Sequence, residues 1–387
     1  MIKRSILPDM LSMVFKQKAI IVLGPRQSGK TTLLKEVQKE LNMKTTFLNC
    51  DDAKDMLFFE NQSITSMKAN VGQSKLLIID EAQRVENIGL SIKLLVDNLP
   101  DIQVIASGSS SFELANSIKE PLTGRKYEYH LYPISFSEMT DYNSVWEEQK
   151  MLSHRLVYGM YPEIITHQGE EDRLLTNLAG SYLYKDIFSF QDLRKPELLD
   201  KLIRALALQI GSEVSYTELA QLTNSDHNTI QRYIQLLENA YIIFRLPNYS
   251  NNQRNEIKRS RKIYFYDNGI RNALLNDFRP IELRDDIGKI WENYCVSERV
   301  KLLSNNLINR NFYFWRNIHQ SEVDYIEIYE DKMNAFEFKW NPKKSGRAIA
   351  LNRLYPHAVL ETITPENYRM FLSMQHGKAN SPERLKG

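Results

Sequence analysis

The stretch AIIVLGPRQSGKTTLLKEV, residues 19–37, decides the fold of the first part of the chain. It begins with a short apolar run, continues through a turn that contains glycine, and ends in residues with helical periodicity. Gly24, Gly29, Lys30 and Thr31 complete the pattern G-x-x-x-x-G-K-[ST] in the strand-turn-helix context that this motif requires. The sequence therefore predicts a P-loop.

The predicted loop has the chemistry of a phosphate cradle. Its glycines let the backbone curl so that N–H groups point inward, and the helix start adds partial positive charge. We expect ATP as the ligand, with Lys30 reaching the β and γ phosphates and Thr31 holding Mg²⁺ by its hydroxyl. A glycine turn that spells the pattern by chance is the alternative. The residues expected to contact the nucleotide are Gly24, Pro25, Arg26, Gln27, Ser28, Gly29, Lys30, Thr31 and Thr32.

A second apolar run, in KLLIIDEAQRV at residues 75–85, supports the P-loop. It predicts a buried parallel strand with two acids, Asp80 and Glu81, at its carboxyl end, where α/β sheets bind ligands. We expect Asp80 to orient Mg²⁺ through a water ligand and Glu81 to polarise the water that attacks the γ phosphate. Two acids that merely decorate the surface are the alternative. Together with the first motif, the pair predicts ATP hydrolysis.

A third predicted strand, IQVIASGSSS at residues 102–111, ends in small polar residues beside the other two strand ends. Ser107 or Ser109 is expected either to sense the γ phosphate or to begin a polar loop, and the sequence favours neither. Arg125 stands just ahead of a further strand. It is a candidate for stabilising charge in the transition state, in its own subunit or a neighbour's, and its alternative is a surface ion pair.

Four runs together resemble a known family: GPRQSGKTT, LLIIDEAQ, ASGSSS and LTGRKYEYHLYPISFSE. Their order is similar to that of AAA+ ATPases whose members carry a C-terminal domain of unknown function with a restriction-endonuclease-like core. The resemblance covers most of the chain. It implies an ATP-hydrolysing core with Lys30, Thr31, Asp80 and Glu81 in the roles given above. Residues 136–200 carry no second arginine signature typical of an AAA+ lid.

Length and composition limit what the rest can be. A chain of 387 residues is too long for one compact core, so two or three domains are expected. With 42% hydrophobic and 25% charged residues, the composition is that of a soluble globular protein. The net charge of +2 gives no overall attraction to nucleic acid or acidic lipid, so any basic contact surface must be local. Cys50 and Cys295 are expected to be reduced core thiols.

The apolar runs predict a cytoplasmic protein without membrane contact. The first residues are basic, but Pro8 and Asp9 interrupt the apolar stretch and no small-residue cleavage site follows it. No apolar run approaches the roughly 20 residues that a membrane helix needs.

Helical patterns dominate the middle of the chain. Residues 136–195 are interpreted as a helical lid or linker that packs on the ATPase core. Further on, LLDKLIRALALQIGS, SYTELAQLT and SDHNTIQRYIQLLENA predict three helices, the second with a capping box of Ser215 and Glu218 and the third beginning at Ser225. A strand, YIIFRLPNYS, follows them. Three helices and a strand predict a winged helix.

The third of these helices and a basic window after it predict a contact with DNA. The helix is expected to bury Ile230, Tyr233, Ile234 and Leu237 and to turn its polar side outward. Each phosphate that the window QRNEIKRSRK neutralises would add affinity and salt dependence. Winged helices that bind proteins, and basic loops that are only solvated, are the alternatives. The predicted DNA contacts are His227, Asn228, Gln231, Arg232, Arg254, Lys258, Arg259, Arg261 and Lys262.

The stretch VDYIEIYEDKMNAFEFK, residues 323–339, predicts a two-stranded hairpin with a charged face. Because strand side chains alternate, Glu337 and Lys339 share one face, and the apolar residues that alternate with them supply the core on the other. An unpaired charge in a dry core costs several kcal/mol, so the charged face must meet water, a metal or a polar partner. The apolar residues are Phe336, Phe338 and Trp340.

The order of helix, strand and hairpin resembles that of PD-(D/E)xK nucleases. Two carboxylates on adjacent strands, Asp324 and Glu337, can hold Mg²⁺ at a phosphodiester, and Lys339 can position or deprotonate the attacking water. The resemblance places Glu292 as the helix acid. The alternative is a retained fold whose acids simply pair with Lys339.

These observations predict an α/β chain with a P-loop, AAA+-like parallel-sheet domain, a helical linker, a winged helix and a C-terminal α/β restriction-endonuclease-like domain. The expected parts are an N-terminal extension (1–17), the ATPase core (18–135), a helical lid or linker (136–195), a winged helix with a basic wing (196–262), a nuclease-like domain (263–365) and a disordered tail (366–387).

Three functions follow from this organisation. The first is a P-loop ATPase, using ATP and Mg²⁺, whose winged-helix and nuclease-like half acts on DNA. The second is an ATP-dependent regulatory switch whose inactive nuclease fold recruits a protein partner, and the third is a transcription regulator built on the winged helix. DNase activity and homo-oligomer formation are left open.

Overall fold

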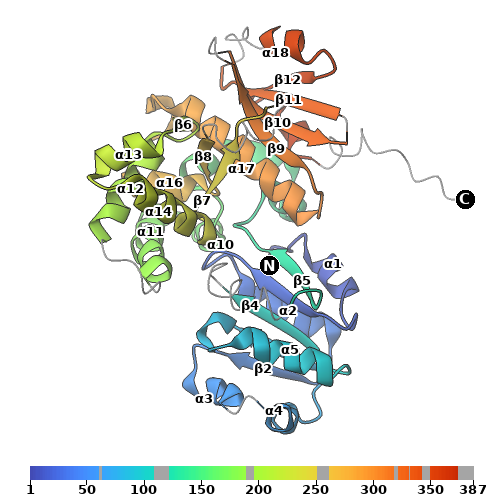
Figure 1. Cartoon of the computed structure of the whole chain (residues 1–387). Helices are drawn as coiled ribbons and strands as arrows, with labels where there is room; N and C mark the ends of the chain where they lie inside the picture. The colour runs from blue at the N-terminus through green and yellow to red at the C-terminus, as the bar shows by residue number, and fades with distance from the viewer. Residues whose placement is uncertain are drawn as a thin grey trace, which may run out of the picture. The chain divides into compact units, whose positions relative to one another are not determined.

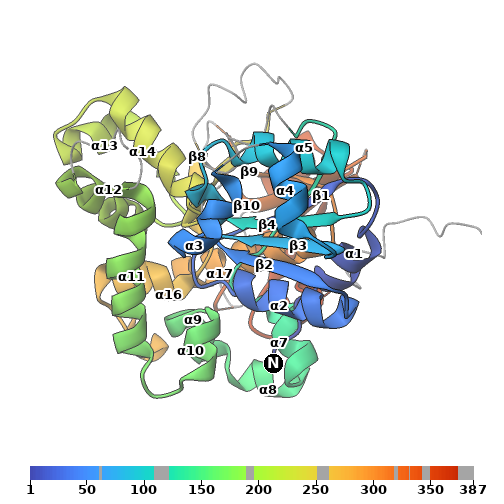
Figure 2. The same ribbon diagram turned by 90° about the horizontal axis from the view of Figure 1, so that it is seen from below.

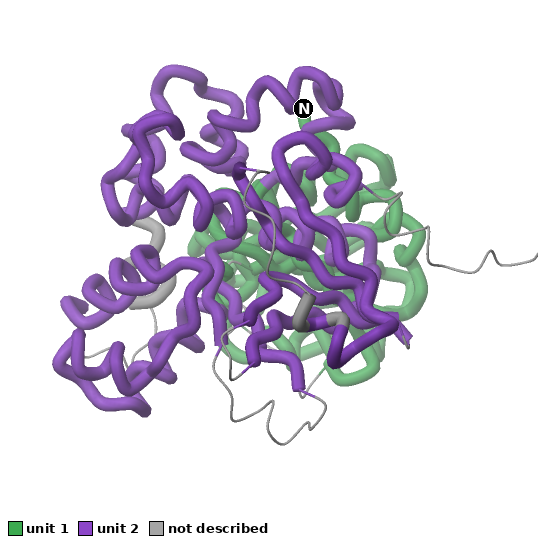
Figure 3. The backbone as a smooth tube through the Cα atoms, turned by 90° about the horizontal axis from the view of Figure 1, so that it is seen from above, with its two compact units in different colours: residues 1–133, 184–190, 239–241 green, residues 134–183, 191–238, 242–387 purple. Residues whose placement is uncertain are grey.

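The computed structural model describes residues 1–60, 63–108, 122–188, 196–250, 261–317, 321–330, 332–341 and 349–373. The chain divides into two compact units, coloured separately in Figure 3. Unit 1 comprises Met1–Pro133, Tyr184–Phe190 and Asn239–Tyr241; unit 2 comprises Ile134–Leu183, Gln191–Glu238 and Ile242–Gly387.

Unit 1 is built on a parallel sheet whose described strands have the order β2-β3-β4-β1-β5. The strands β1, β3 and β4 are buried along their whole length, because their continuous apolar runs are covered on both faces. The predicted parallel α/β domain is confirmed. The strands are β1 (Ala19–Leu23), β2 (Thr45–Asn49), β3 (Leu76–Asp80), β4 (Gln103–Gly108) and β5 (Lys126–His130).

Helices cover both faces of this sheet: α4 and α5 lie on one face and α2 on the other (Figure 2). The short helix α1 packs Leu7 and Met10 into the same apolar cluster as Leu33 and Val37 of α2. The predicted N-terminal extension is therefore part of the core of unit 1. The helices are α1 (Leu7–Ser12), α2 (Lys30–Leu41), α3 (Ala53–Met56), η1 (Leu57–Phe59), α4 (Ile64–Val71), η2 (Ala82–Arg84) and α5 (Ile88–Asn98).

Most of the helical stretch that follows β5, Ile134–Leu183, groups with unit 2, whereas Tyr184–Phe190 groups with unit 1. The buried side-chain amide of Asn272 donates to the carbonyl oxygens of Leu156 at 3.1 Å and Val157 at 2.7 Å. In these bonds, a side chain from a distant part of the sequence satisfies backbone carbonyl groups of α9. No local sequence pattern predicts such a contact. The helices are α7 (Phe136–Tyr142), α8 (Val145–Lys150), α9 (Leu152–Tyr158), α10 (Pro162–Thr166) and α11 (Glu171–Phe188).

Three helices and a small antiparallel sheet follow (Figure 1). The third helix begins at His227 rather than at Ser225, because the carboxylate of Asp226 accepts a hydrogen bond from the backbone N–H of Thr229 at 3.0 Å and so caps it. The sheet has the order β6-β8-β7. The elements are α12 (Pro196–Leu208), β6 (Glu213–Val214), α13 (Tyr216–Thr223), α14 (His227–Asn239), β7 (Ile243–Pro247) and β8 (Arg261–Phe265).

The last part of unit 2 is a sheet whose described strands have the order β12-β11-β10-β9. The predicted hairpin is confirmed as β10 and β11, with Tyr329 opposite Lys332. The predicted boundary after residue 262 is wrong, because it would cut through β8. The elements are α16 (Asn268–Leu275), η3 (Ile281–Leu283), α17 (Ile287–Asn305), β9 (Asn311–Arg316), β10 (Glu322–Tyr329), β11 (Lys332–Phe338), α18 (Ile349–Leu354), β12 (Val359–Ile363) and α19 (Tyr368–Phe371).

The expected disordered tail is folded where it is described. Tyr368 and Phe371 are fully buried. The Tyr368 ring centre lies 5.6 Å from that of Trp291, and the Phe371 ring centre lies 4.8 Å from that of Phe336. The prediction for residues 366–373 is wrong because two aromatic rings in a polar stretch are enough to anchor a short helix. Residues 374–387 lie outside the described residues.

Two further expectations concern single features. Cys50 and Cys295 are buried and not disulfide-bonded, and burial raises the pKa of Cys50 to about 12, which suits unreactive core thiols. Among the described residues, no helix has both the length and the apolar character needed to cross a membrane.

Candidate nucleotide site and buried charge cluster

The turn between β1 and α2 is held by a close approach of two backbones. The N–H of Leu131 donates to the carbonyl oxygen of Leu23 at 2.7 Å. A Cβ at Gly24 would lie 2.1 Å from the carbonyl oxygen of Leu131, so this position requires glycine. Gly29, directly before α2, has a left-handed φ of 94°. The backbone conformation therefore explains why glycine occupies both positions of the motif.

Lys30 is the first residue of α2, and its side chain folds back over this turn. Its Nζ donates to the carbonyl oxygens of Gly24 at 3.0 Å and Pro25 at 2.8 Å, and the residue is only 4% exposed. The ammonium is thus kept within the loop, at the place where the motif requires a group that contacts phosphate.

Thr31, Asp80 and Ser107 come together from α2, β3 and β4. The Thr31 hydroxyl donates to one carboxylate oxygen of Asp80 at 2.6 Å, and the Ser107 hydroxyl donates to the other. Asp80 and Ser107 are buried. Hydroxyl and carboxylate oxygens are the hard ligands that Mg²⁺ prefers, so the donor set fits the ion predicted to bind with ATP.

Glu81 follows Asp80 with a left-handed φ of 53°, which turns the chain sharply at the end of β3. Its carboxylate accepts a hydrogen bond from the side-chain amide of Gln83 at 2.6 Å, and its N–H donates to the Ser107 hydroxyl at 3.4 Å. Of the two candidate serines, Ser107 lies in this cluster, and Ser109 lies outside the described residues.

Arg125 lies at the other end of the sheet from the P-loop. In the β1–β5 register, Ala19 is opposite Lys126 and Leu23 is opposite His130, so Arg125 is level with the start of β1, whereas the P-loop follows its end. Its Nε pairs with Asp97 at 2.6 Å. The predicted contact with the nucleotide of its own subunit is wrong for this reason. A role toward a neighbouring subunit stays a prediction.

Arg4 supports the P-loop and was missed in the sequence. Its buried guanidinium donates to the carbonyl oxygen of Ser28 at 2.7 Å and to that of Tyr132 at 2.6 Å. One side chain therefore joins the P-loop to the segment after β5. No motif surrounds Arg4, so only the folded contacts identify it.

In unit 2 the predicted nuclease-like residues gather around a lysine that was assigned to the DNA contacts. The Nζ of Lys262 lies 3.0 Å from Glu292, 2.5 Å from Glu322 and 3.9 Å from Asp324. The residue is 1% exposed, so its predicted contact with DNA is wrong. It was misassigned because β8 carries the end of the basic window into the interior.

Electrostatics keep this lysine charged. Burial by itself lowers its pKa, but the charges of Glu292, Asp324 and Glu322 raise the pKa of Lys262 above its ordinary value. Burial also raises the pKa of Glu292 to about 7, although the neighbouring ammonium of Lys262 opposes the shift. The cluster is therefore a compact group of mutually dependent charges.

The remaining nuclease-like residues extend the cluster along the hairpin. The Nζ of Lys339 lies 3.8 Å from Asp324 and 3.9 Å from Glu337. The β9–β10 register shifts between Val323 and Ile326, and Asp324, which lies in this interval, accepts a hydrogen bond from the backbone N–H of Phe338 at 2.9 Å. In the described part of the chain, no group of three or more His, Cys, Asp or Glu residues is arranged to hold a metal. The predicted Mg²⁺ ligands Asp324 and Glu337 are thus not part of such a ligand group.

The cluster borders a cavity of about 890 Å³, lined in part by Glu292, Asp324, Lys339 and Trp340. Much of the rest of its lining is charged and of both signs, so the cavity has no single electrostatic preference. The charged residues of this remaining wall are Arg271, Asp277, Arg279, Asp285, Asp286 and Lys289.

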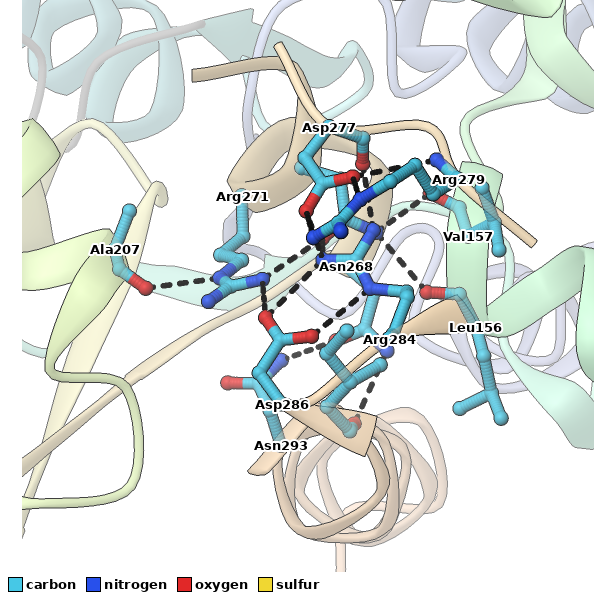
Figure 4. A network of polar contacts seen from close by, with 12 residues as sticks. Leu156, Val157, Ala207, Asn268, Arg271, Asp277, Arg279, Arg284, Asp286 and Asn293 are labelled. Carbon is cyan, nitrogen blue, oxygen red and sulfur yellow. Dashed lines mark hydrogen bonds and ion pairs between the residues drawn. The ribbon is translucent and has the colours of Figure 1, made fainter. Parts of the chain in front are cut away.

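A network of ion pairs holds part of that wall in place (Figure 4). Arg271 pairs with Asp286 at 2.6 Å and donates to the carbonyl oxygen of Ala207 at 2.8 Å, which joins α16 to α12. Hydrogen bonds from the Arg279 side chain lower the pKa of Asp277 to about 2. These side chains already have partners, so the wall is a structural network.

The surface predicted to contact DNA is partly described. On α14, Ile230, Tyr233, Ile234 and Leu237 are buried, and the opposite side is open to solvent. Arg261 is the first residue of β8 and is half-buried. Arg254, Lys258 and Arg259 lie outside the described residues. All four residues of α14 predicted to contact DNA are exposed: His227, Asn228, Gln231 and Arg232.

Comparison with protein families supports a P-loop ATPase domain in this chain. Residues 16–140 match the family described as AAA domain, a range that includes the P-loop, Asp80 and Glu81. Residues 149–280 match Domain of unknown function (DUF8612), and residues 287–368 match Domain of unknown function (DUF4143). The last two descriptions name no activity.

Relatives of the chain include an uncharacterized protein of Mycobacterium tuberculosis, 28% identical over 326 residues, which cover 83% of this chain and 70% of that protein. Another, from Haemophilus influenzae, is 24% identical over 362 residues, covering 87% of this chain and 86% of its own. Among solved structures, a Thermotoga maritima RuvB variant is 16% identical with a TM-score of 0.34, covering 66% of this chain and 95% of RuvB. A DNA replication initiation factor is 17% identical with a TM-score of 0.26, and the match covers 60% of this chain and 85% of that protein.

Proposed function

We propose that this chain hydrolyses ATP in unit 1 and uses its nucleotide state to control a second half that contacts DNA. The observation that carries the ATPase is the convergence of Lys30, Thr31, Asp80 and Ser107 at the P-loop. They come from a helix start and two strand ends of one parallel sheet, where α/β folds bind ligands. The AAA domain match over residues 16–140 supports the same activity.

Each side chain has a definite task in this proposal. Lys30 exchanges its bonds to loop carbonyls for bonds to the β and γ phosphates, and Thr31 and Asp80 hold Mg²⁺. The bound Mg²⁺ neutralises charge on the phosphates. Glu81 orients the attacking water and accepts its proton, and the hydrogen bond from Gln83 occupies only one of its two carboxylate oxygens.

Glu81→Gln is expected to reduce the rate of phosphate release about 10²–10⁴-fold, the usual range for loss of a general base. Binding of a fluorescent ATP analogue should stay at the level of the unaltered protein, because the amide keeps the shape of the side chain. Glu40→Gln, an exposed acid on α2, is the control and should hydrolyse ATP normally. Normal turnover by purified Glu81→Gln would remove Glu81 from this role.

The proposed DNA contact rests on the order of elements from α12 to β8. Helix, short strand, two helices and two further strands, with a sheet order of β6-β8-β7, is the arrangement expected of a winged helix. The exposed side of α14 carries donors and acceptors suited to base edges and phosphates. This supports α14 as the reading helix, with Arg232 as its charged contact.

Arg232→Ala is expected to weaken binding to duplex DNA by a similar factor on unrelated sequences. It should also lower the slope of log affinity against log salt by about 1, the loss of one phosphate contact. Fluorescence anisotropy at several salt concentrations measures both effects. Arg173→Ala, an exposed arginine on α11, is the matched control and should leave both unchanged.

A second candidate function is an ATP-dependent switch whose nuclease-like fold cleaves nothing and recruits a protein partner. The observation that favours it is the Lys262 ammonium among Glu292, Glu322 and Asp324, where a nuclease would need a metal. The anisotropy experiment separates the two functions. An absence of DNA binding at low salt would favour the protein partner.

A further inference from the structure

Lys262 lies between elements that are far apart in the sequence. It belongs to β8, in the sheet β6-β8-β7, whereas Glu292 lies on α17 and Glu322 and Asp324 lie on β10. Its Nζ reaches all three carboxylates, at 3.0, 2.5 and 3.9 Å. One buried ammonium is therefore the shared counter-ion of three acids on two different elements.

The surroundings of this ammonium fix it in place. The Tyr264 hydroxyl, two residues along β8, donates to the same Glu292 oxygen at 2.6 Å. The Phe314 ring lies 5.6 Å from Nζ, close enough for a cation-π contact. With carboxylates on its other sides, the lysine tip has little room to move. A buried charge is tolerated only with such complete pairing.

We infer that Lys262 is a built-in cation that replaces the divalent metal of this carboxylate cluster. The cluster retains acids of a kind that bind Mg²⁺ or Mn²⁺, but the lysine satisfies their charge and takes the space between them. A divalent ion entering the cluster would lie only a few ångströms from an ammonium that is covalently attached and cannot leave. Unit 2 therefore binds no divalent metal at Asp324 in its native form.

Removing the ammonium should reverse this property. In Lys262→Met a side chain of similar reach lacks the charge and leaves three partly buried carboxylates without the ammonium that they share. Divalent ions bind oxygens at roughly 2.0–2.6 Å, depending on the metal. The carboxylates that now surround the Lys262 ammonium would therefore have to move closer to a metal ion that takes its place. The variant is therefore expected to gain a site for Mn²⁺, and Mn²⁺ should stabilise it against unfolding.

The test uses the full chain without nucleotide, so that the P-loop site contributes equally to every sample. Free Mn²⁺ is measured by electron paramagnetic resonance in titrations of the native protein, Asp324→Asn, Lys262→Met and the Lys262→Met/Asp324→Asn double variant. We expect the first two to bind equally, Lys262→Met to bind one additional Mn²⁺ per chain, and the double variant to lose it. Thermal unfolding should show that Mn²⁺ raises the Tm of Lys262→Met by more than that of the native protein.

Two results would overturn the inference. One is Mn²⁺ binding by the native protein that Asp324→Asn abolishes, or plasmid cleavage with Mn²⁺ that depends on Asp324 in the same way. The other is a folded Lys262→Met that gains no Mn²⁺. Circular dichroism establishes whether that variant folds, and if it does not, the comparison of native protein with Asp324→Asn still decides. Neither comparison depends on ATP hydrolysis in unit 1.

Discussion

Replacing Lys30 with alanine is expected to reduce ATP turnover about 10²–10³-fold or more, the range for losing one preorganised group that stabilises transition-state charge. Lys30 is the ammonium that the P-loop holds next to its own carbonyl oxygens. Without it, the charge that grows on the phosphoryl oxygens loses its nearest cation. Because the proposed mechanism also has this ammonium contact the β phosphate before the reaction, ATP affinity should fall as well.

The joint loss of affinity and turnover separates Lys30→Ala from Glu81→Gln, which should bind ATP and fail to hydrolyse it. Lys35→Ala, an exposed lysine one turn further along α2, is the matched control for charge and helix context. Phosphate release and isothermal titration with ATP measure the two effects. Normal affinity and turnover in a folded Lys30→Ala protein would exclude the P-loop as the catalytic site.

Glu327→Ala is expected to lower the free energy of unfolding of unit 2 by about 3–5 kcal/mol, the cost of removing one partner from a buried ion pair. The Glu327 carboxylate is fully buried between two guanidinium groups, with Arg299 at 2.6 and 3.0 Å and Arg310 at 2.5 Å. The charges of these arginines hold the pKa of Glu327 below its usual value, although burial alone would raise it. After the substitution, the two guanidinium groups would lose the carboxylate that they share.

Tryptophan fluorescence measures this loss selectively, because the chain's 4 tryptophans, Trp146, Trp291, Trp315 and Trp340, all belong to unit 2. Denaturant unfolding followed by this signal therefore reports on unit 2 alone. Glu366→Ala is the control, since that side chain is exposed and should change the unfolding free energy by less than about 0.5 kcal/mol. Equal midpoints for Glu327→Ala and the control would show that the buried triad contributes nothing to stability.

The features that sequence predicted best are those encoded by neighbouring residues. The P-loop, the apolar run before Asp80 and the 323–339 hairpin are each read from one short window, and the fold places each as expected. The burial of one side of α14 was predicted for the same reason, since helical periodicity is local.

The misassigned residues depend on contacts between distant segments. Arg125 was expected at the phosphate because it precedes a strand, but only the β1–β5 register shows which end of the sheet it occupies. Lys262 was assigned to DNA because the residues around it in the sequence are basic. Its burial depends instead on the pairing of β8 with β6 and β7. Arg4 has no motif at all, and its two carbonyl partners are 24 and 128 residues away.

The lysine on β8 also restricts how unit 2 can move. A hinge opening between the α12–α14 module and the four-stranded sheet would pull a buried ammonium away from its acids and break the ion pairs between them. Domain motions generally occur where few such contacts cross. The module and the sheet should therefore travel as one rigid body, and a nucleotide-driven rearrangement would have to bend the chain at some other joint.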